Sequence, residues 1–212
     1  MKNFPLQIVT FVLLIISSTT FSAENRLWLG KGLGEGTINV SDKERIIFGP
    51  THEIVFHRTG NWGIVSGFGL MDVEINNDLE FNSNDVQVHY RNLAGYFLLG
   101  LKFKLSFMNI GGHEVFGVSE TTFGGKITRK SGSENSFERK KDNSLFRGRE
   151  VLLMFDLEND WIFGLKYGIF NRRLDLSFRD LDADIKQDKN YLIFLGTKWG
   201  GQNKKKGKKK KK

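Results

Sequence analysis

Hydrophobic and polar side chains alternate with a period of two along much of the chain. In segment 161–169, every second residue from Trp161 to Ile169 is large and apolar, and the residues between them include Gly164, Lys166 and Gly168. Segment 62–70 repeats the pattern, with three glycines on its second face. Successive side chains of a β-strand point to opposite faces, so this alternation predicts strands, and no later segment shows a convincing helical repeat.

The pattern predicts eight strands, at residues 26–36, 45–58, 62–75, 85–101, 113–128, 144–157, 161–174 and 189–199. Short connections at 59–61, 158–160 and a less clear one near 106–112 alternate with long polar ones around 37–44, 76–84, 129–143 and 175–188. An eight-stranded antiparallel up-and-down barrel explains this alternation, because its long loops then share one end. We therefore expect an all-β fold with four long loops at one end.

One face of these strands is large and apolar, whereas the other holds glycine and a few charges. Glycines coat a water-exposed surface poorly, but they fit a narrow eight-stranded lumen. The apolar face then points outward, and a closed barrel can face lipid because it pairs every backbone polar group. The expected membrane-facing residues are Trp62, Ile64, Phe68, Leu70, Val151, Leu153, Phe155, Trp161, Phe163, Leu165, Tyr167, Ile169, Tyr191, Ile193 and Leu195. The expected lumen residues are Gly63, Gly67, Gly69, Arg91, Glu150, Gly164, Lys166 and Gly168.

Four tryptophans lie at strand ends that an up-and-down barrel brings to one rim: Trp28, Trp62, Trp161 and Trp199. Aromatic side chains form girdles at membrane interfaces, so these four predict an interfacial girdle on the short-turn side. Trp28 alternates with Leu27 and Leu29, which leaves an inward orientation open.

Two segments resemble the small bacterial outer-membrane β-barrels of the OmpA membrane-domain and opacity-protein type. Residues 26–34 (RLWLGKGLG) resemble their first strand, and residues 191–199 (YLIFLGTKW) resemble their closing strand. The resemblance implies an outer-membrane location in a Gram-negative bacterium, contact with outer-membrane lipid, and recognition of the terminal aromatic, here Trp199, by the barrel-assembly machinery. The chain continues for 13 residues past Trp199, whereas such chains usually stop there.

The two ends of the chain differ from its body. Residues 1–22 have the basic start, apolar run and small residues of a secretory signal peptide, and the apolar run is too short for a membrane anchor. Residues 23–200 form the expected barrel domain, and residues 201–212 form an expected disordered lysine-rich tail. A contact of Lys204, Lys205, Lys206, Lys208 and Lys209 with anionic lipid or an acidic wall polymer is the functional hypothesis for that tail.

Composition narrows the function further. The net charge of +8 comes from the eight lysines of the tail, since the other 24 basic side chains match 24 acidic ones, and a nucleic-acid partner is not expected. The chain has no cysteine, no paired histidines at metal-binding spacing and no recognisable Ser-His-acid arrangement. We therefore expect no metal, no cofactor and no enzymatic activity.

An eight-stranded barrel encloses too little space for a porin-like pore. The sequence thus favours a role for the outer loops in adhesion, surface interaction or envelope integrity, with a host or envelope ligand. Candidate contact residues there are Arg139, Lys140, Lys141, Asp180, Asp182 and Asp184. Arg91, Glu150 and Lys166 are expected to form an ion-pair network that plugs the lumen. Two alternatives stay open: a soluble lipocalin-like barrel that binds an apolar ligand, and a lipid-modifying outer-membrane enzyme.

Overall fold

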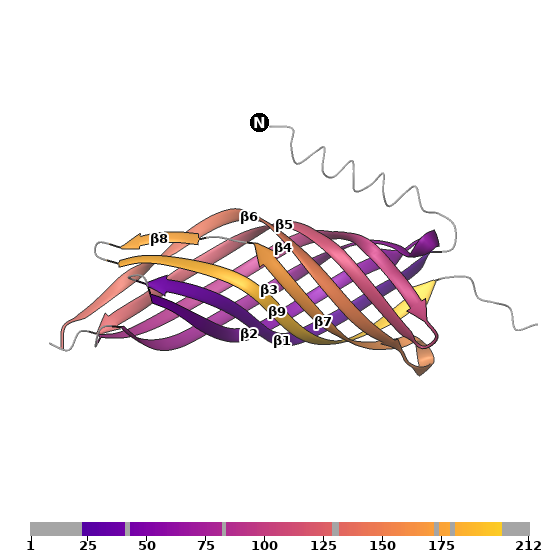
Figure 1. The fold of residues 1–212 in the computed structure, drawn as a ribbon, viewed down its shortest axis with the longest axis horizontal. Helices are drawn as coiled ribbons and strands as arrows, with labels where there is room; N and C mark the ends of the chain where they lie inside the picture. The colour runs from indigo at the N-terminus through magenta and orange to yellow at the C-terminus, as the bar shows by residue number, and fades with distance from the viewer. Residues whose placement is uncertain are drawn as a thin grey trace, which may run out of the picture.

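The computed structural model describes residues 23–40, 43–81, 84–128, 132–171, 174–178 and 181–200. The expected signal peptide and the lysine tail lie outside these residues. Nearly all described residues belong to strands, which wind around a single axis (Figure 1). No helix in the described ranges has the length and apolarity needed to cross a membrane.

The strands form one closed antiparallel sheet. Their bounds are β1 (Glu24–Val40), β2 (Lys43–Thr59), β3 (Ile64–Phe81), β4 (Asn84–Leu105), β5 (Met108–Thr128), β6 (Glu134–Asp156), β7 (Trp161–Asn171), β8 (Leu174–Phe178) and β9 (Leu181–Gly200). Each strand from β1 to β6 pairs with the next, and β1 pairs with β9 to close the barrel. Because β7 and β8 both pair with β9, they occupy one position in the sheet. The eight-stranded up-and-down barrel expected from the sequence is confirmed.

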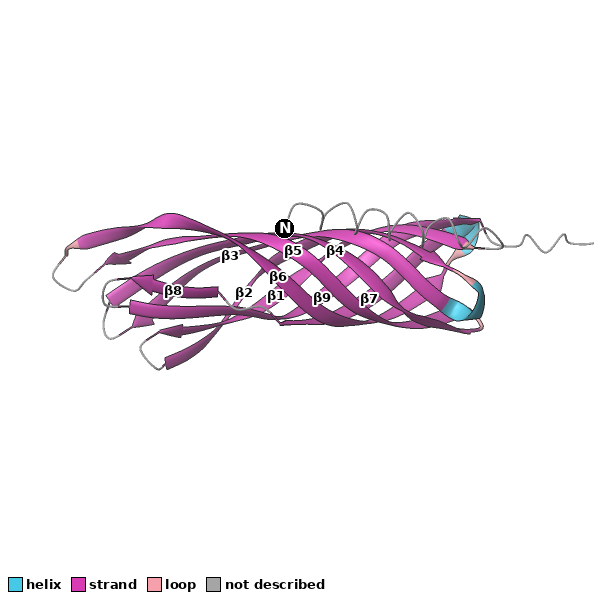
Figure 2. Cartoon of the chain, turned by 90° about the horizontal axis from the view of Figure 1, so that it is seen from above, coloured by secondary structure: helices cyan, strands magenta, loops and turns pink. Residues whose placement is uncertain are grey.

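Tight turns join the strands at the end of the barrel that also holds the start of β1 and the end of β9 (Figures 1 and 2). Two of these turns are short 3-10 segments, η1 (Asn61–Gly63) and η2 (Glu158–Asp160). Gly63 has φ 74° and belongs to the turn, so its expected place in the lumen is wrong. The third turn is at Ser106, and β5 begins at Met108, so the longer connection expected near 106–112 is wrong as well.

At the opposite end, the polar segments expected to be long loops are largely paired strand. β3 runs to Phe81 and β4 restarts at Asn84, while β6 already begins at Glu134. Figure 2 shows these strands continuing far from the tight turns as a projecting extension of the barrel. Polar side chains indicate that a segment is in water, but a strand in water can still pair its backbone with neighbouring strands. The polar segments were therefore wrongly predicted to be loops.

Side chains along each strand alternate between the lumen and the outside. In β7, Ile162, Gly164, Lys166 and Phe170 are buried, whereas the alternating residues Trp161 and Phe163 are exposed. The lipocalin-like alternative requires Trp62, Phe68, Phe163 and Tyr167 to line the cavity. It is wrong, because Trp62 is 95% exposed and Phe68 and Phe163 also lie outside.

Candidate functional sites of the barrel

Ion pairs line the lumen close to the tight turns. Arg26 is buried and donates hydrogen bonds to Glu24 (2.6 Å) and to Asp156 (3.1 Å). Lys102 Nζ lies 2.8 Å from the same Glu24 carboxylate, and Lys198 Nζ lies 3.1 Å from Asp156. This rim network links β1, β4, β6 and β9 across the lumen, so it ties the first and last strands to the middle of the sheet.

A second network lies deeper in the lumen, where Lys166 of β7 stands between two carboxylates. Its Nζ donates to Glu53 of β2 at 2.5 Å and to Glu150 of β6 at 2.6 Å, and all three side chains are fully buried. The Tyr96 hydroxyl donates to the same Glu53 oxygen. The Lys166 Nζ also lies 5.5 Å from the centre of the Trp28 ring. We call Glu53, Tyr96, Glu150 and Lys166 the central network.

Large aromatic side chains fill the space around the central network, and glycines make room for them. The rings of Trp28 and Phe194 stack with their centres 4.4 Å apart. A Cβ atom at Gly164 would lie 2.3 Å from the Phe194 ring, and one at Gly69 would lie 2.4 Å from the Tyr96 hydroxyl. The lumen is therefore packed with side chains at this level.

Two of the four histidines lie inside the barrel. His57 and His113 are buried with ring centres 6.1 Å apart, and His113 Nδ1 lies 3.8 Å from Glu150 Oε2. Within the described ranges, no three histidine or carboxylate side chains are arranged to hold a metal ion. The two rings therefore extend the polar lining between the rim and the central network.

The structure brings together only part of the network expected from the sequence. Glu150 and Lys166 pair in the lumen, but Arg91 points outward and forms a bidentate pair with Asp72, so its placement in the lumen is wrong. Trp28 is 1% exposed and stacks inside the barrel, so it does not belong to the interfacial girdle. Glu53 and Tyr96 were missed. The expected lumen glycines Gly67, Gly69, Gly164 and Gly168 do face inward, against His57, Tyr96, Phe194 and Phe170 respectively.

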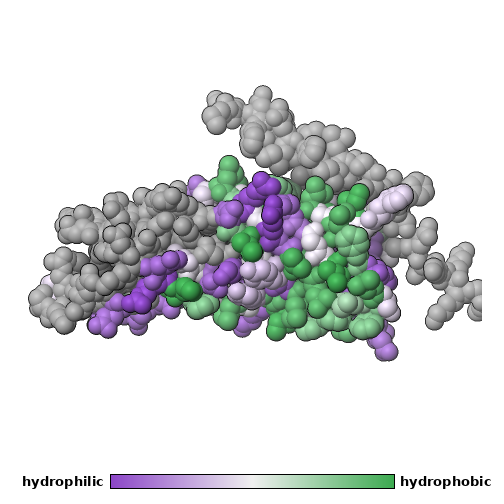
Figure 3. Space-filling model, in the orientation of Figure 1, coloured by the Kyte–Doolittle hydropathy of each residue, from purple (hydrophilic) through white to green (hydrophobic). Residues whose placement is uncertain are grey.

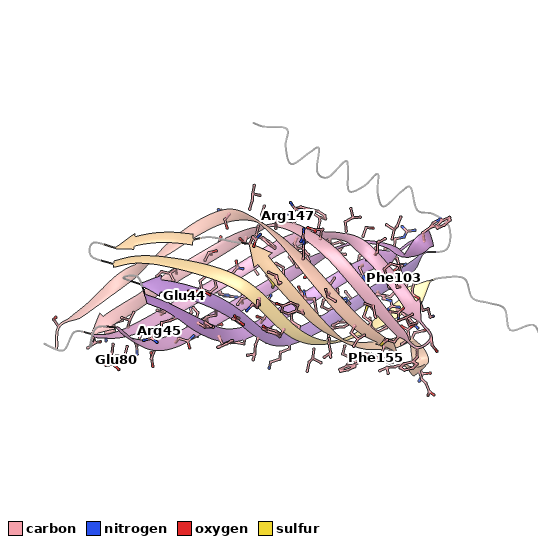
Figure 4. The ribbon with its side chains drawn as sticks, viewed as in Figure 1. Glu44, Arg45, Glu80, Phe103, Arg147 and Phe155 are labelled. Atoms are coloured by element: carbon pink, nitrogen blue, oxygen red, sulfur yellow. The ribbon has the colours of Figure 1, made fainter. Side chains whose placement is uncertain are left out.

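A belt of apolar side chains surrounds the barrel at the level of the two networks. Among the residues expected to face the membrane, Leu153, Phe155 and Tyr167 are half-buried on the outer face and the other twelve are exposed there. On the face seen in Figure 3, hydrophobic residues cover most of the tight-turn half. At the tight-turn edge of the belt lie Trp62, Trp161 and Trp199, together with Phe103, Phe107 and Phe155, which the sequence analysis did not assign to a girdle. Figure 4 labels Phe103 and Phe155 near this end.

The candidate contact residues lie in the projecting part. Arg139, Lys140 and Lys141 belong to β6, and Asp182 and Asp184 belong to β9, rather than to loops. The structure describes the backbone of these five residues but not their side chains. Asp180 and the tail lysines lie outside the described residues.

No family model matches the chain, and no curated protein matches its sequence. Solved structures do match. The outer membrane protein OprG from Pseudomonas aeruginosa is 13% identical, with a TM-score of 0.59 over 85% of this chain and 97% of that one. A major outer membrane protein from Thermus thermophilus is 11% identical, with a TM-score of 0.51 over 84% of this chain and 100% of that one. Ail of Yersinia pestis, the attachment invasion locus protein, is 9% identical with a TM-score of 0.47, over 84% of this chain and 100% of that one.

The chain has the fold of the small outer-membrane β-barrels. The closed barrel and its outward apolar belt suit a membrane span, which agrees with the outer-membrane location expected from the sequence. Barrels of this class turn tightly on the periplasmic side and project on the extracellular side. Following this class, we call the tight-turn end of the barrel periplasmic and the projecting end extracellular.

Proposed function

We propose that this barrel acts at the cell surface, in adhesion or another surface interaction, through the projecting part of its sheet. The observation that carries this proposal is the interior of the projection. Val73, Ile75, Val86, Val88 and Tyr90 are buried there, while Glu74, Asp78 and Glu80 point outward, where they are half-buried or exposed. A packed apolar core makes a rigid platform, and a rigid platform binds a partner at a lower entropic cost than mobile loops do.

The packed lumen supports a surface role over solute transport. The central network joins β2, β4, β6 and β7 across the barrel, and Trp28 and Phe194 stack beside it. Small outer-membrane barrels with filled interiors leave no aqueous channel, unlike porins of 16 or more strands. We therefore propose no bulk diffusion through this barrel and no enzymatic role for its lumen.

The charge of the projection indicates what kind of partner suits it. Exposed acidic side chains are frequent on the described part, at Glu44, Asp78, Glu80, Asp85 and Glu120, whereas Arg45 is an exposed basic one (Figure 4). The basic residues Arg139, Lys140 and Lys141 lie together on β6. We propose that a host or envelope ligand with cationic charge docks on these acidic side chains, and that Arg139, Lys140 and Lys141 of β6 are further contact residues for that ligand.

Shortening the projection tests the surface role. The pairs Asp78↔Gln87 and Lys126↔Ser136 mark positions where the hairpins can be cut in register. Residues 79–86 and 127–135 are each replaced by Asn-Gly, which suits a two-residue hairpin turn. We expect bacteria that display the shortened barrel to adhere to an epithelial cell monolayer at least about tenfold less than bacteria with the intact barrel, because the outer ends of two hairpins are removed, with Glu80 and Asp85 of the proposed docking surface.

Glu158→Gln, at a periplasmic turn, is the matched control and should leave adherence unchanged. Heat-modifiable migration on a gel verifies that each variant is folded. Undiminished adherence of the shortened barrel would contradict the proposal. Liposome swelling provides a second test: uptake of a small sugar at porin-like rates would show that the lumen conducts, and the transport part of the proposal would then be wrong.

The outward belt and the closing strand suggest two further partners. We propose that the fifteen belt residues contact outer-membrane lipid, and that Trp199, exposed at the end of β9, is read by the barrel-assembly machinery. Slower membrane insertion of Trp199→Ala than of Trp161→Ala in a reconstituted assembly reaction would support recognition of Trp199.

A further inference from the structure

Three charged side chains share the outer face of β5 and β6. Arg149 Nε donates to Glu114 Oε1 at 2.7 Å, and Arg147 Nε and Nη2 lie 3.3 Å from Glu114 Oε2. The Arg147 guanidinium also lies 5.3 Å from the centre of the Phe116 ring. The side chains are 62% exposed at Arg147, 77% at Arg149 and 35% at Glu114, so all three meet the surroundings of the barrel.

These charges lie within the apolar belt. At about 3.3 Å per residue and a strand tilt of about 45°, Arg149 lies roughly 16 Å and Arg147 roughly 21 Å along the barrel axis from Asp156, at the periplasmic end of β6. The apolar band of such a barrel is about 25 Å tall, so both arginines lie in its extracellular half. The exposed neighbours around them are apolar except for Asn171, which pairs with Arg147; the apolar ones are Phe116, Val118, Leu145, Val151 and Ile169. Figure 3 shows a hydrophilic patch between hydrophobic areas where Figure 4 labels Arg147.

The patch carries one positive charge more than its carboxylate can balance. Within the described part of the chain, both arginines hydrogen-bond to Glu114, and Arg149 does so through Nε alone. The outward pair Asp72–Arg91 differs, because one carboxylate there meets one guanidinium in a bidentate contact. An unbalanced guanidinium in hydrocarbon is costly, so an anion at Arg147 and Arg149 would stabilise the barrel in its membrane.

We propose that Arg147 and Arg149 bind the phosphate of an anionic lipid in the outer leaflet. A guanidinium presents several N–H donors in a plane and suits phosphate oxygens. Both side chains are long enough to extend from the belt toward the headgroup level. Val151, on the periplasmic side of both arginines, and Ile169, which pairs with Arg149, offer apolar surface to the acyl chains of the same lipid. A lipid satisfies both requirements at once, whereas free phosphate or a carboxylate from a second copy of the chain satisfies only the charge.

Native mass spectrometry of the full chain in detergent micelles tests this proposal. The micelles contain either diphosphorylated lipid A or the same lipid without its phosphates. We expect intact protein to retain the phosphorylated lipid at least about tenfold more often than the phosphate-free one. The double variant R147Q/R149Q should lose this preference, and R91Q should keep it, because Arg91 is also exposed and outward but already balanced by Asp72.

Several results would overturn the proposal. Equal retention of the two lipids by the intact protein would do so, and this comparison requires no variant to fold. Unchanged retention by a folded R147Q/R149Q protein, or an equal loss in R91Q, would place the lipid elsewhere. Complete displacement of the lipid by excess inorganic phosphate would show that the patch binds a free anion instead. A dimer of the intact protein that R147Q/R149Q converts to a monomer would assign the patch to a second copy.

Discussion

Replacing Lys166 with methionine tests whether the charges of the central network are shielded from water. Lys166 Nζ is the cation that both Glu53 and Glu150 contact, at 2.5 and 2.6 Å, and neither carboxylate is exposed. Without it, Glu53 keeps the Tyr96 hydroxyl, while Glu150 keeps His113 at 3.8 Å. Removal of one partner from a buried ion pair costs about 3–5 kcal/mol, and we expect K166M to lower the free energy of unfolding by that amount.

Urea unfolding of the barrel in lipid vesicles, followed by circular dichroism and by heat-modifiable migration, measures this loss. Lys31→Met is the matched control, because Lys31 is exposed on the outer face of β1, and its effect should stay within about 0.5 kcal/mol or be stabilising. The triple variant K166M/E53Q/E150Q removes the uncompensated charges and should recover at least half of the loss. If K166M unfolds at the same urea concentration as the intact protein, the side chains that fill the lumen do not keep water away from the carboxylates of Glu53 and Glu150.

Two further predictions concern the packing of the lumen. Gly69→Ala should cost about 1–3 kcal/mol in the same urea assay, because its Cβ would lie 2.4 Å from the Tyr96 hydroxyl; Gly95→Ala, which meets only Leu70 at 3.6 Å, should change stability by less than about 0.5 kcal/mol. In single-tryptophan variants, brominated lipid should quench the fluorescence of Trp161 strongly and that of Trp28 weakly, since only Trp161 lies on the outer face; equal quenching would contradict the inward position of Trp28.

The membrane-crossing part of the barrel could be predicted from the sequence because each face has one consistent character on most strands, with the outward charges Glu114, Arg147 and Arg149 of β5 and β6 as an exception. From Trp161 to Ile169, every outward side chain is large and apolar, and the inward ones are glycine, lysine or a single isoleucine. A period of two then fixes strand, face and environment together. Trp28 was misplaced because position at a strand end was given more weight than its alternation with Leu27 and Leu29, which are the outward residues of β1.

The central network could be predicted only in part, since its contacts join distant segments. Glu53 and Lys166 are 113 residues apart, and alternation assigns both to the lumen without saying that they meet. Glu53 was overlooked because strand 45–58 shows weak alternation, although Ile54 and Phe56 point outward and Glu53, Val55 and His57 point inward. The registers of β2, β6 and β7 bring the three charges together at one height, and a register is set by pairing across the whole sheet.

The misplacement of Arg91 follows from a reversal of polarity along its strand. On the periplasmic half of β4, Phe97, Leu99 and Leu101 point outward to the apolar belt. Further along the same outward face come Arg91, His89 and Gln87, while Val86, Val88 and Tyr90 turn inward.

Along β4 the side chains keep their alternation between inward and outward. What changes is the medium around the outward side chains, from lipid to water. β3 reverses at the same height, where outward Leu70 is followed by outward Asp72 and Glu74. The rule that glycine and most charged side chains point into the lumen therefore applies only within the bilayer. Beyond that level the same sheet obeys the rule of a water-soluble barrel, with an apolar core and a charged coat, and this is why the projection can stay folded outside the membrane.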